Sequence, residues 1–476
     1  MAKRKSRATD KDLQTIASLR GDPSLCSGQA LQSHKSNMDY KIASPSARND
    51  IKGYNISMNT QLKAAKNASR ILAKSTNDER NKALELISKE LIQSTNQILA
   101  SNQKDIEEGK KNNLSNALLD RLLLDEKRLT GMSHSIKKVI AQNDPLGKVL
   151  ASWKHIKGMT IRKISVPLGV ICVIYEARPN VTTDAVSLAI KSGNAIILRG
   201  SQYAINSNQA IVDVIHNALS KHVGAFHETP FDSNIVQFIA SKEREETIKI
   251  LEAKEYVDLV IPRGGEDLKD FVLKYSKIPV IGAGGGTCHL FIDETAPDQM
   301  ALDIAVNAKT QRPGVCNAIE TILVHKNIAG NILPELEKVL SAKNVEIFAC
   351  DRTRKIILSA KPATEEDWYK EYLDLKVAVK VVDSLSEAID HINKYGTKHS
   401  ESIITTNKEN AKRFQEEIDA ACVYVNASTR FTDGEEFGFG SEIGISTQKL
   451  HARGPIALEQ LVTYKYLITG EGQIRT

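Results

Sequence analysis

The spacing of hydrophobic and polar residues divides the chain into a helical first part and a longer part in which strands and helices alternate. Helical spacing begins at Met58 and continues to about residue 142, and Thr76 with Glu79 forms a capping box at the start of one helix. Two apolar faces are predicted in this part, one formed by Leu84, Ile87 and Leu91 and the other by Leu118, Leu119, Leu122 and Leu123.

After this helical part the pattern changes to short apolar runs. Residues 149–163 alternate around Gly158, which is typical of a hairpin, and residues 166–175 are continuously apolar, which is typical of a buried parallel strand. A helix is predicted from about Thr183. Each following apolar run is succeeded by a polar or glycine turn and then a helix, so a parallel α/β sheet is expected; the runs are 195–198, 235–239 and 257–261.

Beyond Gly286 the same alternation begins again and predicts a second α/β unit. The tail 461–468 is strand-like, and we expect it to return to the hairpin of a neighbouring subunit. Four regions are predicted: a flexible extension at 1–55, a first domain at 56–286 with the hairpin at about 149–165, a second domain at 287–455, and a terminal strand at 456–476. Strands expected in the second unit are 321–324, 345–348, 377–382, 402–405 and 422–425.

Composition narrows the class of protein. The 476 residues are 41% hydrophobic and 26% charged, with a formal net charge of +6, which suits an anionic ligand without indicating nucleic acid. Six cysteines without metal-ligand spacing indicate a reducing compartment, the cytoplasm, and no metal site is expected. No apolar run approaches the roughly 18 residues of a membrane span.

The most reactive candidate is Cys316. It follows Arg312-Pro313-Gly314-Val315, where proline and glycine exclude a regular helix or central strand, and an apolar run resumes at Ile319. The thiol is therefore predicted on a turn, where a cation at Arg312 or Lys309 would favour the thiolate. A small buried hydrophobic cysteine is the alternative for this residue taken alone.

The segment TQRPGVCNA around Cys316 resembles the cysteine motif of the γ-glutamyl phosphate reductases, a family within the aldehyde dehydrogenase superfamily. Four other segments resemble the same family in the same order: VPLGVICVIYEARPNVTTDA, KSGNAIILRGSQYAINSN, IPVIGAGGGTCHLFID and STQKLHARGPIALEQL. The resemblance covers roughly residues 57–475. It implies an aldehyde dehydrogenase-like α/β fold with two parallel-sheet domains and a small oligomerisation hairpin.

The resemblance also implies a reaction. Cys316 would attack an acyl phosphate and form a thioester, and the side chain of Asn180 would hold the oxyanion together with the Cys316 N–H. The reaction of the family is the NADPH-dependent reduction of L-glutamyl 5-phosphate to L-glutamate 5-semialdehyde, which is the second step of proline biosynthesis from glutamate. For Asn180 alone, a turn residue after proline is the alternative.

The cofactor expected from the resemblance is NADPH/NADP+. Arg199 and neutral Gln202 occupy positions where superfamily members carry a lysine and often a glutamate, and a guanidinium there would favour a 2′-phosphate. A surface arginine is the alternative, and GxGxxG is absent from the turns. Cofactor-binding candidates are Ala177, Arg199, Gly200, Ser201, Gly264, Gly265 and Glu371.

One departure from the hydrolytic aldehyde dehydrogenases bears on the mechanism. Their general base is a glutamate, whereas residues 281–286 here read IGAGGG and contain no carboxylate. Attack by water on a thioester would then be disfavoured, leaving hydride or phosphate as the partner. The candidate substrate-binding residues include Arg178, Arg312 and Arg430, whose guanidinium groups suit a carboxylate or phosphate. Asn317 is a further candidate, and Glu401 is the candidate for binding an ammonium group.

Two other functions are compatible with parts of the sequence. A CoA-acylating aldehyde dehydrogenase also lacks the deacylating glutamate, but QRPGVCN and EARPNVT disfavour it. A non-catalytic interaction protein using the basic start of the chain is disfavoured by the intact set of Cys316, Asn180 and Arg199. The expected partners are a small-molecule substrate, further copies of the chain in a dimer or tetramer, and glutamate 5-kinase as a candidate; neither nucleic acid nor a membrane is expected.

Overall fold

The structure is a computed structural model that describes residues 57–223 and 231–475. The extension predicted for residues 1–55 lies outside this range. The described residues form one compact unit, and no helix among them is long and apolar enough to cross a bilayer.

The predicted helical part is confirmed. The capping box of Thr76 and Glu79 opens α2, and Leu84, Ile87 and Leu91 on its apolar face are fully buried. Leu123 is an exception, because it caps the end of α4 and remains 39% exposed instead of joining an apolar face. The helices are α1 (Met58–Leu72), α2 (Asn77–Gln93), α3 (Thr95–Lys111), α4 (Asn116–Leu122) and α5 (Glu126–Ala141).

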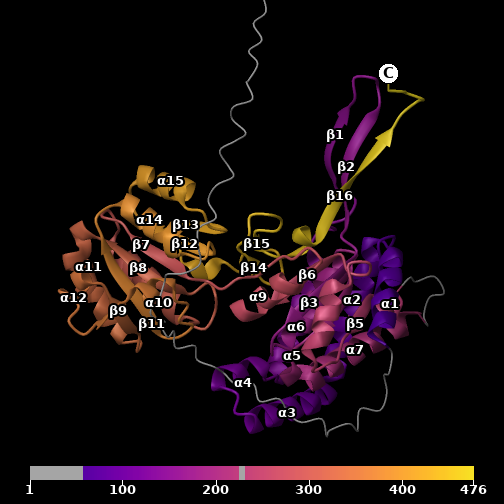
Figure 1. Ribbon diagram of the computed structural model, residues 1–476, viewed down its shortest axis with the longest axis horizontal. Coiled ribbons are helices and arrows are strands. Elements are labelled where there is room, and N and C mark those ends of the chain that lie inside the picture. Colours follow the sequence, from indigo (N-terminus) through magenta and orange to yellow (C-terminus); the bar gives the residue numbers. More distant parts are fainter. Residues whose placement is uncertain (1–56, 224–230, 476) are drawn as a thin grey trace, which may run out of the picture. The chain divides into compact units, whose positions relative to one another are not determined.

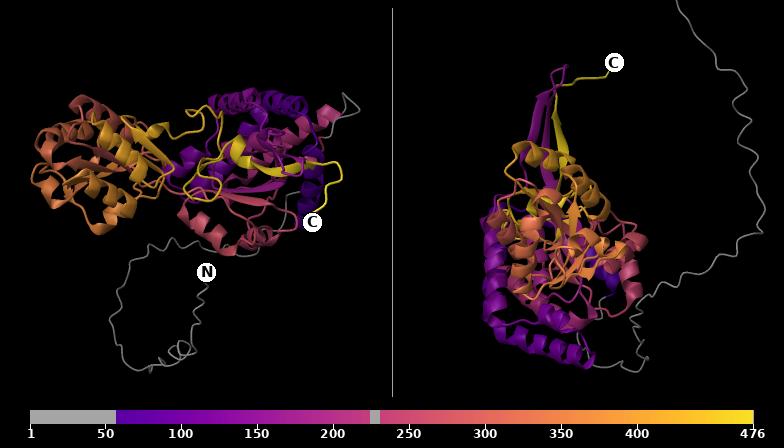
Figure 2. Two further views of the ribbon diagram at one scale, coloured as in Figure 1. Left: turned by 90° about the horizontal axis from the view of Figure 1, so that it is seen from above. Right: turned by 90° about the vertical axis from the view of Figure 1, so that its left-hand side faces the viewer.

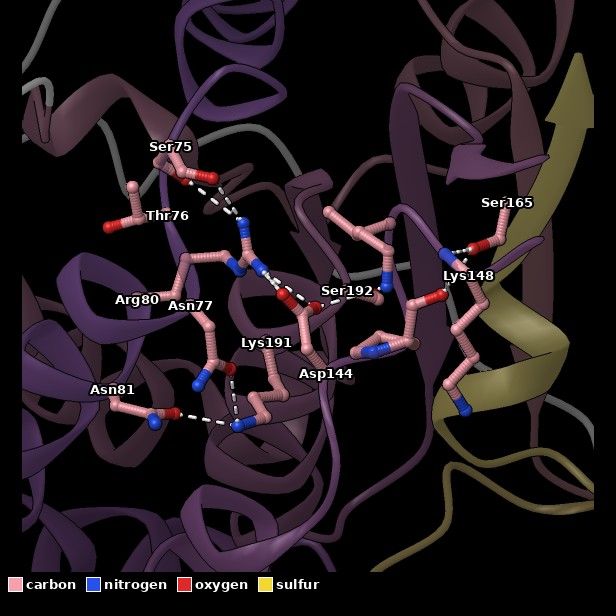
Figure 3. Close-up of polar contacts among 12 residues, drawn as sticks. Ser75, Thr76, Asn77, Arg80, Asn81, Asp144, Lys148, Ser165, Lys191 and Ser192 are labelled. Atoms are coloured by element: carbon pink, nitrogen blue, oxygen red, sulfur yellow. Dashed lines mark hydrogen bonds and ion pairs between the residues drawn. The ribbon is translucent and has the colours of Figure 1, made fainter.

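Buried charges connect these helices to the first sheet (Figure 3). The Arg80 guanidinium donates to both carboxylate oxygens of Asp144 at 2.7 and 2.8 Å, and the Lys191 ammonium donates to Asn77 and Asn81 at 2.9 and 2.7 Å. Arg80 and Lys191 are almost wholly buried, so these partners offset the cost of removing their charges from water. The network fixes α2 against the end of α6.

The first sheet contains four parallel strands in the order β5-β4-β3-β6. Successive residues of β3 face opposite sides: Ile171 and Val173 pack with α2, α5, α6 and α7, whereas Cys172 and Ile174 pack with α1, α8 and α9. Its elements are β3 (Val170–Tyr175), α6 (Asn180–Lys191), β4 (Ala195–Arg199), α7 (Ile205–Val223), β5 (Val236–Phe238), α8 (Arg244–Glu252), β6 (Leu259–Arg263) and α9 (Glu266–Tyr275).

Two boundaries differ from the prediction. The apolar run 166–175 is not one strand, because Gly169 adopts a φ of +128° and separates the end of β2 from β3. Helix α6 begins at Asn180 instead of about Thr183, since Pro179 already adopts helical backbone angles at the cap.

The order of the strands creates a ligand-binding edge. The chain runs from β3 through β4 to β5 on one side and then returns to place β6 on the other side of β3. Ligands of parallel α/β sheets bind at such a switch point, outside the carboxyl ends of the strands. The segments that leave β3 and β6 meet there, and the Glu176 N–H donates to the Arg263 carbonyl at 3.2 Å.

The second sheet contains seven parallel strands in the order β10-β9-β11-β8-β7-β12-β13 (Figure 1). Helices α10 and α11 contribute to the core on one face of its centre, and α14 and α15 to the core on the other. Strand β7 was not predicted, although CHLFI is an apolar run. The elements are β7 (Cys288–Ile292), α10 (Asp298–Thr310), β8 (Ile319–His325), α11 (Lys326–Ser341), β9 (Glu346–Ala349), α12 (Asp351–Arg354), β10 (Lys361–Pro362), α13 (Glu365–Tyr369), β11 (Lys376–Val382), α14 (Leu385–Tyr395), β12 (Ser400–Ile404), α15 (Lys408–Glu417) and β13 (Cys422–Val425).

A three-stranded antiparallel arm extends from the first sheet (Figures 1 and 2). It consists of β1 (Val149–Lys154), β2 (Thr160–Pro167) and β16 (Val462–Thr469), with Gly158 in the hairpin turn at a φ of +91°. The tail was predicted to pair with the hairpin of a neighbouring subunit, but β16 pairs with β2 of its own chain. The reason is local: Asn194 holds the Leu461 carbonyl at 2.8 Å and directs the tail to Pro167.

Candidate active site

Cys316 lies on a turn, as predicted. Helix α10 ends at Thr310, Pro313 prevents its continuation, and a hydrogen bond from the Ala318 N–H to the Val315 carbonyl closes the turn just before β8. Cys316 is half-buried, whereas the two residues that follow it are buried. The turn therefore brings the thiol to the amino-terminal edge of the seven-stranded sheet.

The glycine loop 284–286 packs directly behind the nucleophile. A Cβ built on Gly286 would lie 1.5 Å from the Cys316 carbonyl oxygen, so any side chain there would displace the turn. The Gly285 N–H donates to Glu266 and the Gly286 N–H donates to Glu371, both at 2.7 Å. Glu371, predicted to bind the cofactor, thus supports the loop that positions the nucleophile.

Asn317 and Arg430 hold a second segment against the turn. The Asn317 amide donates to the Thr432 carbonyl at 2.8 Å, and its oxygen accepts a hydrogen bond from Arg430. Asn317 is only 4% exposed, so its side chain positions neighbouring residues and is unavailable to a ligand. Arg430 is half-buried and also donates to Gln311 at 2.7 Å.

Guanidinium groups from both sheets converge on Cys316. Arg178 and Arg263 lie near enough to the thiol to affect its ionisation, and Arg430 interacts with Cys316 and with exposed Arg312. Burial, together with Arg263 and Arg121, lowers the pKa of Arg178 to about 10. Like charges held this close indicate that an anionic ligand completes the cluster.

The pKa of the thiol is raised above its ordinary value. Burial is the largest cause and outweighs the lowering by Arg263 and Arg178, while Glu371 raises the pKa further. The predicted cations at Arg312 or Lys309 are therefore not the principal ones. Lys309 is fully buried and paired with Glu320, behind the turn.

Asn180 lies at the first position of α6, two residues beyond Arg178. Its side chain is exposed, and its amide donates to Asp184 at 3.1 Å. Burial raises the pKa of Asp184 to about 6, while Asn180, Ser135 and Arg263 act in the opposite direction. The amide is thus oriented from one side and retains a second N–H for a ligand.

The carboxyl edge of the first sheet carries the predicted cofactor residues. Arg199 ends β4 and donates to the Gly200 carbonyl at 2.7 Å, but its Nε is buried without a hydrogen-bond partner. Ser201 caps the short helix at Gln202–Ala204. Glu176 accepts from the Gly265 N–H at 2.9 Å at the start of α9.

Close backbone packing distinguishes the glycines of this edge. A Cβ on Gly264 would lie 2.7 Å from Glu176, and a Cβ on Gly200 would lie 2.1 Å from the Asn208 amide. The orphaned Arg199 Nε beside a bare backbone fits a phosphorylated nucleotide cofactor. Ala177 is buried among apolar residues and can contribute only its backbone.

Comparison with known proteins decides the family. The profile of the "Aldehyde dehydrogenase family" matches residues 46–349 and 377–459. A γ-glutamyl phosphate reductase of Thermoanaerobacter pseudethanolicus is 52% identical over 415 residues, which are 87% of this chain and 99% of the relative, and one of Clostridium novyi is 51% identical over 86% and 97%. The chain belongs to the aldehyde dehydrogenase family, within its γ-glutamyl phosphate reductases.

Solved structures agree with this aldehyde dehydrogenase family assignment. The γ-glutamyl phosphate reductase of Thermotoga maritima superposes with a TM-score of 0.84 at 47% identity, covering 87% of this chain and 99% of that one. An acetylating aldehyde dehydrogenase of Geobacillus thermoglucosidasius, at 16% identity and a TM-score of 0.62, shares the fold. The predicted aldehyde dehydrogenase-like α/β fold is confirmed.

Glu401, predicted to bind a substrate ammonium, lies on a buried strand of the second sheet. Glu401 is 1% exposed on β12, where it accepts hydrogen bonds from the backbone and the ring of His289 at 2.7 and 3.0 Å. It faces inward because β12 is a buried strand between β7 and β13. Its Oε1 is buried and has no hydrogen-bond partner, so a contact with a substrate ammonium stays a prediction.

Two arginines of the site were missed. Arg263 is the last residue of β6 and Arg121 donates to the Gly314 carbonyl at 3.4 Å from α4. Arg263 could have been found from the sequence, because it follows a parallel strand directly and ligands bind at carboxyl ends. Nothing in the local sequence marks Arg121, since its place depends on how α4 packs.

Proposed function

We propose that the chain reduces L-glutamyl 5-phosphate with NADPH, giving L-glutamate 5-semialdehyde, NADP+ and phosphate, through a thioester on Cys316. This is the second step from glutamate to proline. The observation that carries the proposal is a half-buried thiol within the electrostatic influence of guanidinium groups from two sheets, with a glycine loop that contains no carboxylate packed behind it. The relatives named γ-glutamyl phosphate reductase support the same reaction.

The arginine cluster accounts for the acid groups of such a substrate. Arg263 and Arg178 lower the pKa of the thiol and would bind the reacting phosphate, whereas Arg430, which interacts with Cys316 and Arg312, would bind a carboxylate. Planar guanidinium groups bind both anions through paired hydrogen bonds. The same positive field favours the Cys316 thiolate, which is the attacking form.

The acyl transfer and reduction divide one difficult step into two. The Cys316 sulfur attacks the acyl carbon and phosphate leaves, while the Asn180 amide and the Cys316 N–H would stabilise the oxyanion. The nicotinamide cofactor supplies the hydride that reduces the thioester. The carbon–sulfur bond then breaks, which releases the aldehyde and restores the thiolate.

The reverse reaction gives the direct test. Pyrroline-5-carboxylate, the cyclic form of the semialdehyde, and NADP+ are supplied with and without inorganic phosphate, and NADPH absorbance is followed. We expect reduction of NADP+ only when phosphate is present. Turnover that ignores phosphate would mean that water releases the acyl group, and turnover that requires CoA in place of phosphate would make the chain a CoA-acylating enzyme.

Cofactor choice is proposed to depend on Arg199. Its buried unpartnered Nε and its position at the end of β4 support a contact with the adenosine ribose of a cofactor bound at the carboxyl ends of the strands. Replacing Arg199 with alanine should weaken NADPH binding by roughly 10- to 100-fold, the range expected for a charge-assisted hydrogen bond, and leave NADH binding nearly unchanged. Fluorescence titration of each cofactor measures the two dissociation constants.

The matched control is Arg413→Ala, because Arg413 is exposed on α15 and bonded to Glu417. It should bind both cofactors as the wild type does. If Arg199→Ala weakened the binding of NADPH and NADH equally, the guanidinium would not be the group that binds the 2′-phosphate.

We also propose that the chain assembles into a homo-oligomer through the arm of β1, β2 and β16. On this arm the side chains of Trp153 and Ile156 are 43% and 97% exposed, and other large apolar side chains are exposed as well. Several large apolar side chains exposed on one small arm favour a protein contact. Sedimentation of the intact protein tests this, and a monomer at micromolar concentration would contradict it.

A further inference from the structure

A carboxylate that the sequence did not single out lies near the nucleophile. Glu442 follows the 3₁₀ turn at Thr429–Phe431 and precedes the short strand β14 (Ile445–Ser446). It interacts electrostatically with Cys316, although more than a hundred residues separate the two in the chain. Arg263 acts on both groups, so the carboxylate and the thiol share one guanidinium neighbour.

The packing around Glu442 is tight and leaves one carboxylate oxygen without a hydrogen-bond partner. A Cβ built on Gly434 would lie only 2.9 Å from the Glu442 Cβ, and the Gly434 N–H faces the carboxylate. The Oε2 atom is buried and has no hydrogen-bond partner. Buried polar atoms are normally paired, so an orphaned oxygen near a reactive thiol indicates a group supplied by a ligand.

The charges that face Glu442 suit it for proton transfer. Burial raises its pKa to about 7, Arg263 and the Gly434 N–H lower it, and Asp433 and Cys316 raise it. His399 and Cys422 also face it, and burial keeps the pKa of His399 at about 4, so the imidazole is neutral at pH 7. A carboxyl that titrates near the working pH can both give and accept a proton.

We propose that Glu442 is the general acid–base for acyl transfer between Cys316 and phosphate. The assignment rests on the proposed function. In the reductive direction the Cys316 thiolate forms the carbon–sulfur bond, the carbon–oxygen bond to phosphate breaks, and the Glu442 proton passes to the departing oxygen. Hydrogen phosphate and a Glu442 carboxylate result. In the reverse direction the carboxylate removes the proton of hydrogen phosphate as its oxygen attacks the thioester carbon.

The surrounding charges decide which nucleophile this base serves. The guanidinium groups of Arg178 and Arg263 hold a phosphate dianion near the thioester, whereas water has no such attraction. The glycine loop 284–286 contains no carboxylate, and Glu442, from a different part of the chain, takes the role of the base. Glu442 activates phosphate instead of water.

The test separates the two half-reactions in the full-length enzyme. Pyrroline-5-carboxylate and NADP+ are mixed rapidly with enzyme at saturating phosphate, and NADPH is followed from milliseconds to minutes. For Glu442→Gln we expect a burst of about one NADPH per active site, because thioester formation is intact, and then a steady rate roughly 100-fold below wild type. Glu442→Asp should recover part of the steady rate.

A pH series at saturating phosphate supplies a second readout. Because the reverse reaction needs the carboxylate form, the wild-type steady rate should rise with pH through about 7, following the pKa of Glu442. The Glu442→Gln variant should lose that rise. The matched control is Glu436→Gln, whose side chain is exposed in the same loop and which should behave as wild type.

Each contrary outcome has a distinct meaning. An unchanged steady rate in Glu442→Gln, or a burst slowed as much as the steady rate, would overturn the assignment, since the residue would then act on no step or on thioester formation. Wild-type turnover without phosphate would instead overturn the proposed function, and it would do so before any variant is compared.

Discussion

Replacing Cys316 with alanine should reduce turnover by about 10⁴-fold or more, since removal of a nucleophile eliminates the covalent route itself. The side chain that is lost is small and half-buried, so the fold should be retained. The measurement is NADP+ reduction with pyrroline-5-carboxylate and phosphate, with circular dichroism to show that the variant is folded. Burst formation of NADPH should vanish together with the steady rate.

The control for this variant is Cys350→Ala. Cys350 is also a half-buried free thiol, but it follows β9 and contacts Thr353 at 3.3 Å. Its replacement should leave turnover unchanged. If Cys316→Ala kept turnover within about tenfold of wild type, the thioester mechanism would be wrong, because no residual effect of binding alone sustains nucleophilic catalysis at that level.

Local sequence signals account for much of the fold. Continuous apolar runs followed by polar or glycine turns locate most strands of the two parallel sheets, although β7 was missed, and the capping box at Thr76 fixes the start of α2. The prediction failed where one residue changes the backbone. Gly169 divides an apolar run between two sheets, and Pro179 begins α6 earlier than the apolar spacing suggested.

The site was predictable only in part, because it is assembled by contacts between distant segments. The Cys316 turn has local signals in Pro313 and Gly314, and the turn lies where it was expected. Support from Gly286, by contrast, depends on a loop thirty residues earlier passing within contact of the Cys316 carbonyl. The sequence around Glu401 likewise does not reveal that every residue of its strand is buried.

A buried ion pair beneath the nucleophile turn gives the second large prediction. Lys309 and Glu320 are both wholly buried, 2.6 Å apart, and the Lys309 ammonium also donates to the Ile319 carbonyl at 3.0 Å. The pair joins the end of α10 to the start of β8, which are the two ends of the segment that carries Cys316. Glu320→Ala should therefore destabilise the protein by about 3–5 kcal/mol, because it leaves a buried charge without its partner.

Urea unfolding measures this loss, and two further variants define its cause. Glu416→Ala breaks the exposed Lys412–Glu416 pair on α15 and should cost at most about 0.5 kcal/mol. The double variant Lys309→Met, Glu320→Leu removes both charges and should regain most of the stability. A double variant as unstable as Glu320→Ala would place the effect in packing and not in the uncompensated charge.

The pH dependence of the free energy of unfolding of Glu320→Ala tests independently whether Lys309 is the group left without a partner. Burial already lowers the pKa of Lys309, and Glu320 raises it, so loss of Glu320 should lower it further. The unfolded lysine, with a pKa of about 10.4, then binds more protons than the folded one between the two pKa values, and the free energy of unfolding rises with pH in that range. The deficit of Glu320→Ala relative to wild type should thus shrink as pH increases from 7 to about 10, since a neutral lysine tolerates burial. A deficit independent of pH would mean that Lys309 is not the group left without compensation.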